Sequence, residues 1–373
     1  MSSDANTAAN GGIEADDIQL YDGIPIRNLW LLLFYASDLF TEVGPDRVRK
    51  DAPPDDIPNL VAELLTRTVE QRLRRNLSFG YQTVDKTLHR VRGRIDFLKS
   101  RRHQLEKQGK IACRFDEFTV NTPRNRFVRA ALDKLIPMLS NAGLAHRCRT
   151  LSLTLQRIGV TGAMPQLSEI SSIRFGRHDK EDQRMLTAAM LVFQLAIPTE
   201  QVGPHLFSRL SRDSHWLRRL FEKAVGGFYH AVLPSPGWRV LRGKGLKWPV
   251  DLKSERIDEI LPSMITDIII ENRRTGHRTI IDTKFTAILK PGRKDDQMKL
   301  RSGYIYQIYA YLRSQENLDD PMSMKTSGLL LHPSIDGDVD ESVTIQGHRI
   351  RFATVDLSAS ATSIRDRLLL FAN

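Results

Sequence analysis

Two short runs of β-branched residues, separated by a polar turn, constrain the fold of this 373-residue chain more than any other feature. The first run covers residues 265–270 and the second covers residues 279–284, with Thr275 and Gly276 between them. β-Branched residues favour extended backbone, and glycine permits the positive φ angles that tight turns require. The pattern therefore predicts an antiparallel β-hairpin.

Three charged residues interrupt these apolar runs. Asp282 and Lys284 are two positions apart, so they share one face of their strand. If the hairpin loop holds an even number of residues, Asp267 lies opposite Asp282 or Lys284 on that face. An odd loop would place Asp267 on the other face unless a bulge corrects it. The proposed trio thus depends on a register that coordinates can test.

Neighbouring carboxylates repel each other unless a cation lies between them. Mg²⁺ prefers such hard oxygen ligands, and beside a phosphodiester it can activate a water and stabilise the leaving oxygen. Lys284 could orient the water or neutralise developing charge. Asp…Asp-x-Lys is the spacing of the PD-(D/E)XK nucleases. Asp-x-Lys alone also occurs as an ordinary ion pair, but apolar flanks argue against a merely solvated trio here.

Two further residues are candidates for the same site. Gln307 and Tyr311 are four apart on a predicted helix, which resembles the Gln-x-x-x-Tyr motif of RecB-like nucleases. A core stripe through the tyrosines is the alternative interpretation. Glu222 lies on a predicted helix before the sheet, where an acidic residue often completes the metal site in this class; a solvated glutamate is the alternative. The expected catalytic set is Asp267, Asp282, Lys284, Gln307 and Glu222, with Asp267, Asp282 and Glu222 as metal ligands.

The composition favours an anionic partner. Lysine and arginine number 55 against 44 acidic residues, giving a net charge of +11, and nucleic acid is the commonest such partner. Two cysteines, Cys113 and Cys148, cannot build a disulfide framework, which suggests the cytoplasm. The longest apolar run, residues 29–36, is too short to cross a bilayer, so no membrane partner is expected. No Walker-type sequence is present, which excludes a P-loop.

Periodicity along the chain predicts an α/β protein in two parts. Residues 1–17 are small and polar and are expected to be disordered. A mixed α–β domain is expected over residues 18–179, and a restriction-endonuclease-like domain with a central mixed sheet flanked by helices over residues 180–373. Helices are predicted over residues 27–36, 57–76, 125–139, 181–195, 216–232, 304–313 and 358–371. Strands are predicted over residues 115–122, 238–241, 248–252, 265–271, 279–285, 327–331 and 343–352, and strands with turns over residues 79–97.

The order of several short motifs resembles the McrC family, the nuclease subunits of McrBC-type restriction systems. The resembling segments are residues 24–29, 91–97, 116–125, 220–222, 266–268 and 282–284. One departure is that Thr266, rather than the usual proline, precedes the first acidic residue. Since proline is not a metal ligand, this departure does not affect the expected site.

The resemblance implies a division of labour. Family members work with McrB, an AAA+ GTPase that forms hexameric rings and usually carries the domain that reads modified cytosine. Residues 18–179 would then dock on the ring and stimulate GTP hydrolysis, while the C-terminal part would cut methylated or otherwise modified DNA. Arg92 and Arg94 are candidates for that stimulation, although a turn beside a strand explains them equally.

Two other functions stay open at this point. A free-standing RecB-like nuclease would cut DNA without a GTPase. A non-catalytic adaptor would bind the ring and DNA through a decayed site, and its charged residues would be scattered over two faces of the sheet.

Overall fold

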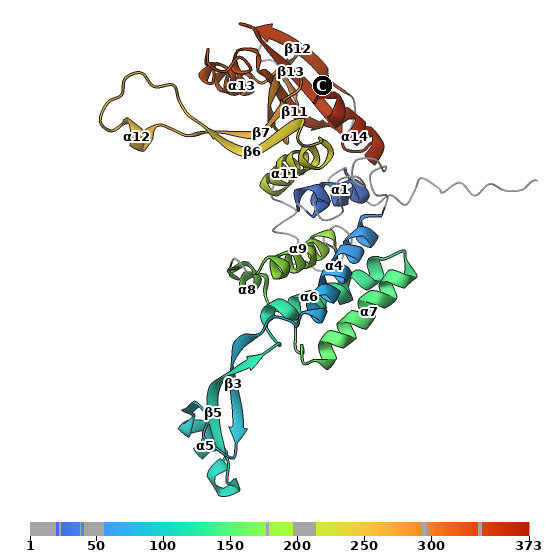
Figure 1. The fold of residues 1–373 in the computed structure, drawn as a ribbon, viewed down its shortest axis with the longest axis vertical. Helices are drawn as coiled ribbons and strands as arrows, with labels where there is room; N and C mark the ends of the chain where they lie inside the picture. The colour runs from blue at the N-terminus through green and yellow to red at the C-terminus, as the bar shows by residue number, and fades with distance from the viewer. Residues whose placement is uncertain are drawn as a thin grey trace, which may run out of the picture. The chain divides into compact units, whose positions relative to one another are not determined.

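The computed structural model describes residues 20–21, 24–37, 39–40, 56–176, 179–196, 214–291, 297–334 and 338–372. The disorder predicted for residues 1–17 lies outside this set. Two compact units are present (Figure 1). The first comprises residues 1–32, 209–222 and 235–373, and the second comprises residues 33–208 and 223–234.

A six-stranded mixed sheet forms the centre of the first unit, in the order β12-β13-β11-β8-β7-β6. β6, β7 and β8 form an antiparallel meander, whereas β8, β11 and β13 run parallel and β12 closes the far edge antiparallel. The strands are β6 (Trp238–Leu246), β7 (Met264–Asn272), β8 (His277–Thr283), β11 (Ser327–Ser334), β12 (Asp340–Ile345) and β13 (His348–Asp356). The prediction of a mixed sheet flanked by helices is confirmed.

The predicted hairpin is the β7–β8 pair. Its ladder runs from Asn272 opposite His277 to Ile268 opposite Ile281, so the loop covers residues 273–276 and holds an even number of residues. Gly276 in this loop has φ +66°, as a tight turn requires. Continued by one position, this register places Asp267 opposite Asp282. The geometric condition that the candidate trio required is therefore met.

One helix, α13 (Ser302–Ser314), connects β8 to its parallel neighbour β11 and packs on both strands (Figure 1). Ile308 and Leu312 on this helix are buried in the core cluster with Ile280 and Leu330. Gly328 makes the close approach possible, because a Cβ there would lie 2.9 Å from Ile308 Cγ1. Leu330 pairs with Asp282 across the two strands, so Asp282 lies on the face that α13 covers.

The beginning and the end of the chain meet in the first unit. Asn28, on helix α1 (Ile26–Ala36), is 1% exposed and donates from Nδ2 to the carbonyls of Leu357 and Ala359, both at 2.8 Å. Helix α14 (Ala361–Leu370) follows this loop and packs on β13. A buried amide that satisfies two carbonyls fixes the loop in place.

The second unit is largely helical. Its main helices are α4 (Ile57–Arg74), α6 (Pro123–Leu135), α7 (Ala142–Arg157) and α9 (Lys180–Ala196). α9 packs on α4 and α6, where its Asp182 is buried and pairs with Arg72 and Arg124. The sequence interpretation began the C-terminal domain with this helix. The structure corrects that point, because the buried face of α9 belongs to the helical unit.

A three-stranded antiparallel sheet, in the order β3-β5-β4, also belongs to the second unit. It comprises β3 (Gly80–Leu88), β4 (Arg94–Ile95) and β5 (Ile111–Thr119), with the short helix α5 (Phe97–Arg102) after β4 (Figure 1). Phe79, Tyr81 and Phe118 cluster on one face and are each at least half exposed. Strands and turns were predicted here, and that prediction is confirmed.

Two local predictions were wrong. Residues 343–352 form two strands, because Gln346 and Gly347 have positive φ and make a hairpin turn. Residues 248–252 form no strand and lie in an exposed loop after edge strand β6.

Candidate functional site

Asp267 and Asp282 form the centre of the candidate site on neighbouring strands β7 and β8. Asp267 Oδ2 accepts hydrogen bonds from the Thr283 amide at 2.7 Å and from the Thr283 hydroxyl at 2.8 Å. Asp282 is only 1% exposed, whereas Asp267 is half-buried. Because both bonds to Asp267 end on Oδ2, the carboxylate has a fixed orientation that leaves Oδ1 for another partner.

Lys284 pairs with Asp282 on the same strand, with 2.5 Å between Nζ and Oδ2. Burial raises the pKa of Asp282 to about 6; Lys284 opposes this shift, and the neighbouring Asp267 adds to it. Lys284 itself is 6% exposed. A buried carboxylate with a raised pKa, beside a second carboxylate and a buried ammonium, is typical of a functional site.

The ring of Tyr304 lies beside Lys284, with 5.2 Å between the lysine Nζ and the ring centroid. His332, on the neighbouring strand β11, is 1% exposed, and its ring lies 5.9 Å from the Tyr304 ring. Nδ1 of His332 lies 2.8 Å from the carbonyl of Thr286, just after Lys284. Burial lowers the pKa of His332 to about 4; the hydrogen bond to Thr286 opposes this shift, and the charges of Lys284 and Arg301 add to it. The imidazole is therefore neutral near pH 7, and Nδ1 carries the proton that Thr286 accepts.

Gln307 and Tyr311 contact each other on helix α13, as their spacing predicts. Gln307 Nε2 lies 2.8 Å from the Tyr311 hydroxyl, and that hydroxyl donates to the Ile265 carbonyl at 3.0 Å. Burial raises the pKa of Tyr311, and the charges of Asp282 and Asp267 raise it further. The pair therefore joins the helix to β7 two residues before Asp267, within the electrostatic field of both carboxylates.

Glu222 lies on helix α11 (Ser214–Val232), in the same unit as the sheet. In the described ranges, no group of three or more His, Cys, Asp or Glu side chains is arranged to hold a metal. Arg218, one turn before Glu222, is the residue of this helix whose charge lowers the pKa of Asp282. Phe221 packs edge-to-face on Phe285, at 5.8 Å between ring centroids.

The residues present suit a metal that needs few protein ligands. Mg²⁺ is commonly held by one or two carboxylates, with waters and substrate phosphates completing its six ligands. Asp267 and Asp282 provide two hard oxygen donors side by side, and their mutual repulsion favours a cation between them. The donor set therefore fits a divalent metal of this kind, with Asp267 and Asp282 as its ligands.

Sequence reasoning missed four residues around this trio: Thr283, His332, Tyr304 and Arg218. Thr283 was read only as the middle of Asp-x-Lys, although a hydroxyl between two charged residues is a signal in itself. His332 comes from a strand 48 positions after Lys284, and only the parallel pairing of β8 and β11 brings the two together. Nothing in the local sequence gives that pairing.

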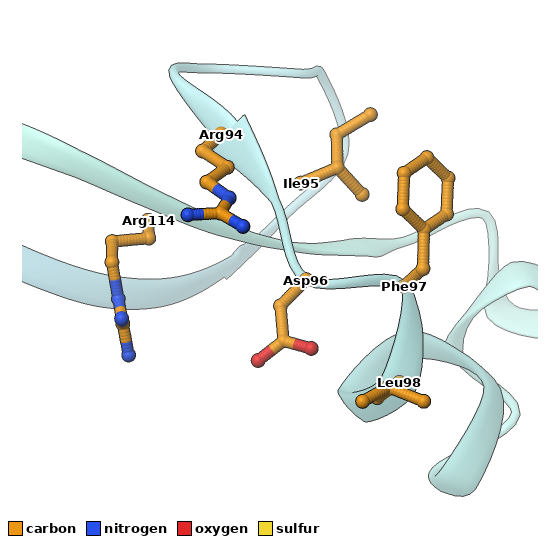
Figure 2. Close-up of a pocket in the computed structure, with 6 residues that line it drawn as sticks. All are labelled: Arg94, Ile95, Asp96, Phe97, Leu98 and Arg114. Carbon is orange, nitrogen blue, oxygen red and sulfur yellow. The ribbon is translucent and has the colours of Figure 1, made fainter.

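Arg92 and Arg94 belong to the second unit, whereas the candidate site belongs to the first. The Arg92 guanidinium stacks on Phe115 at 4.2 Å from the ring centroid. Arg94 lines a pocket of about 350 Å³ with Asp96 and Arg114 (Figure 2). Asp96 also accepts from the Lys99 amide at the start of α5. The pocket is lined by both acidic and basic side chains. Its Arg114 forms an ion pair with Asp85.

The chain matches one protein family and is similar to an Escherichia coli protein over most of its length. The profile of the family described as "McrBC 5-methylcytosine restriction system component" matches residues 26–324. The Escherichia coli K12 protein "Type IV methyl-directed restriction enzyme EcoKMcrBC" is 26% identical over 347 residues, which covers 93% of this chain and 96% of that protein.

Two solved assemblies from Thermococcus gammatolerans are also similar. A chain in the assembly of McrB AAA+ hexamers with bound McrC has a TM-score of 0.40 and 15% identity, and the match covers 93% of this chain and 76% of that one. A chain of the McrBC complex has a TM-score of 0.31 and 16% identity, covering 44% of this chain and 50% of that one. In the part of the chain that the structure describes, no helix is both long and apolar enough to span a membrane.

Proposed function

Because the chain belongs to the family of McrBC 5-methylcytosine restriction system components, we propose that it is the DNA endonuclease subunit of such a system. The observation that carries the proposal is the buried ion pair of Asp282 with Lys284, beside the carboxylate of Asp267. An adaptor with a decayed site would have no need to keep a carboxylate and an ammonium buried beside a second carboxylate, because such burial is costly.

The proposed partner is an McrB-like AAA+ GTPase ring. The support is the family membership and the E. coli relative, which resembles this chain over nearly its whole length. In this proposal residues 18–179 carry the partner-binding surface and residues 180–373 carry the nuclease, except that helix α9 packs with the former part. The complex would act on modified DNA in the cytoplasm.

The proposed reaction is hydrolysis of a phosphodiester. Asp267 and Asp282 would hold Mg²⁺, which when bound lowers the pKa of a water and stabilises the leaving oxygen. Thr283 keeps Asp267 in one orientation, and Lys284 keeps Asp282 ionised against the effect of burial. The Lys284 ammonium also stands where negative charge develops on the phosphate. Gln307 and Tyr311 hold the start of β7 in position.

The deciding experiment is cleavage of methylated plasmid DNA with Mg²⁺ and GTP. The chain is tested alone, with its AAA+ partner, and with that partner as Asp282→Ala. Asp258→Asn, in the exposed loop after β6, is the matched control because its carboxylate pairs only with Lys253 in the described structure. We expect cutting by the wild-type and Asp258→Asn mixtures alone.

Other outcomes would change the proposal in defined ways. Cutting by the chain alone would identify a free-standing nuclease. Unchanged cutting by Asp282→Ala would refute the site. GTP hydrolysis that rises on mixing, without any cutting, would identify the adaptor function. Replacing Mg²⁺ by Mn²⁺ or Ca²⁺ in the same assay identifies the metal.

A further inference from the structure

Arg301 is a half-buried arginine beside the proposed site that lacks an acidic partner. Its Nε is buried without a hydrogen-bond partner, and within the described ranges no carboxylate pairs with its guanidinium. Other arginines of the same unit do have such partners: Arg278 binds Glu271 and Asp320, and Arg351 binds Asp340. Because a half-buried cation without a counter-charge has lost part of its hydration, the position of Arg301 favours an anion from outside the described residues.

The location of Arg301 indicates which anion. Its guanidinium carbon lies 5.9 Å from the centroid of the Tyr304 ring, and Lys284 Nζ lies 5.2 Å from the same centroid. Both cations therefore lie beside the same aromatic ring, and both of their charges lower the pKa of His332. An anion at Arg301 would therefore be a close neighbour of a phosphate at Lys284.

We propose that Arg301 binds a backbone phosphate of the DNA strand being cut, next to the scissile phosphodiester at Asp267, Asp282 and Lys284. The inference rests on the proposed nuclease function. A guanidinium suits this task because its planar fork can donate two hydrogen bonds to one phosphate. Such a contact positions the strand without reading its sequence. Arg301 is thus a substrate-binding residue, and the ring of Tyr304 keeps it at a set distance from Lys284.

The test uses single-turnover cleavage by the complete complex of the chain with its GTPase partner. The variants are Arg301→Gln and Arg301→Lys, with Arg274→Gln in the exposed turn between β7 and β8 as control. At limiting DNA we expect Arg301→Gln to cut about ten-fold or more slowly, as for loss of a charged hydrogen bond. Arg301→Lys should lie between it and the wild type, and Arg274→Gln should match the wild type. Raising the concentration of the complex to saturation, with DNA still limiting, should restore most of the rate of Arg301→Gln.

DNA that carries one uncharged phosphate analogue can show which phosphate Arg301 contacts. DNA carrying a single methylphosphonate at each position around the mapped cut is compared between wild type and Arg301→Gln. At one flanking position the methylphosphonate should slow cutting by the wild type about ten-fold. The same substitution should barely affect Arg301→Gln, because this variant no longer has the guanidinium that binds the phosphate charge. Equal sensitivity of both proteins at every position would refute the contact. Arg301→Lys gives the same comparison if Arg301→Gln melts at a lower temperature than the control.

Asp282→Asn separates this inference from the function on which it rests. If Asp282→Asn stops cutting while Arg301→Gln behaves like Arg274→Gln, only the role of Arg301 fails. If Asp282→Asn cuts normally, the proposed site fails and the role of Arg301 fails with it.

Discussion

Asp267 accepts two hydrogen bonds from Thr283 on the neighbouring strand, one from its amide and one from its hydroxyl. Thr283→Val keeps the shape and the amide but removes the hydroxyl. We expect cleavage by the complex to fall about 10- to 100-fold, the range for residues that orient metal ligands. Thr275→Val, in the exposed turn of the same hairpin, is the control and should cut normally. Equal rates for both variants would show that the hydroxyl is dispensable.

Lys284 has two roles that a double variant can separate. Lys284→Met leaves Asp282 buried without its cation, so we expect about 3 kcal/mol lower stability together with loss of cutting. Adding Asp282→Asn removes the unpaired charge and should recover much of the stability, but not the cutting. Urea unfolding and plasmid cleavage measure the two effects. A double variant as unstable as Lys284→Met would mean that the ion pair is not what the lysine contributes.

His332 predicts a pH dependence of stability. Its pKa is about 4 in the folded protein and 6.5 ordinarily, so between these values the unfolded chain binds more protons. The contribution of His332 therefore favours the native state above pH 6.5 and is lost as the pH falls towards 4. At full extent the loss is about 3 kcal/mol. His332→Asn can still donate to Thr286 and cannot titrate, so its unfolding free energy should fall less between pH 7 and 4.5. Parallel pH profiles of the two proteins would contradict this prediction.

Gly227 on helix α11 makes a close backbone contact in the second unit. A Cβ at this position would lie 2.1 Å from the carbonyl oxygen of Tyr35, a distance that no side-chain adjustment can relieve. We expect Gly227→Ala to cost about 2 kcal/mol or more. Gly303→Ala is the control, because its Cβ would meet no atom within 4 Å and alanine favours a helix. Thermal unfolding of the two variants gives the comparison.

Sequence reasoning succeeded where the information was local. The hairpin and the shared face of Asp282 and Lys284 followed from strand periodicity and a glycine turn, whereas the sequence left the register open between an even and an odd loop. The contact between Gln307 and Tyr311 followed from helix periodicity. These short-range rules do not specify which strands lie next to each other.

The missed features depend on contacts distant in sequence. His332 reaches Thr286 only because β11 pairs parallel to β8, and Tyr304 reaches Lys284 only because α13 packs over β8. The place of helix α9 was missed for the same reason, since its partners α4 and α6 precede it by many residues. An apolar helix face shows that a partner exists but does not show which one.

The two hydrogen bonds of Asn28 limit where this chain can be divided into independent fragments. They tie helix α1 to the loop before α14, so the unit that holds the candidate site includes segments that are far apart in the sequence. A recombination event or an expression fragment that keeps only residues 180–373 loses Asn28 and leaves the carbonyls of Leu357 and Ala359 without these donors. Residues 180–373 are therefore not a self-sufficient module, because the unit around the candidate site needs helix α1 as well.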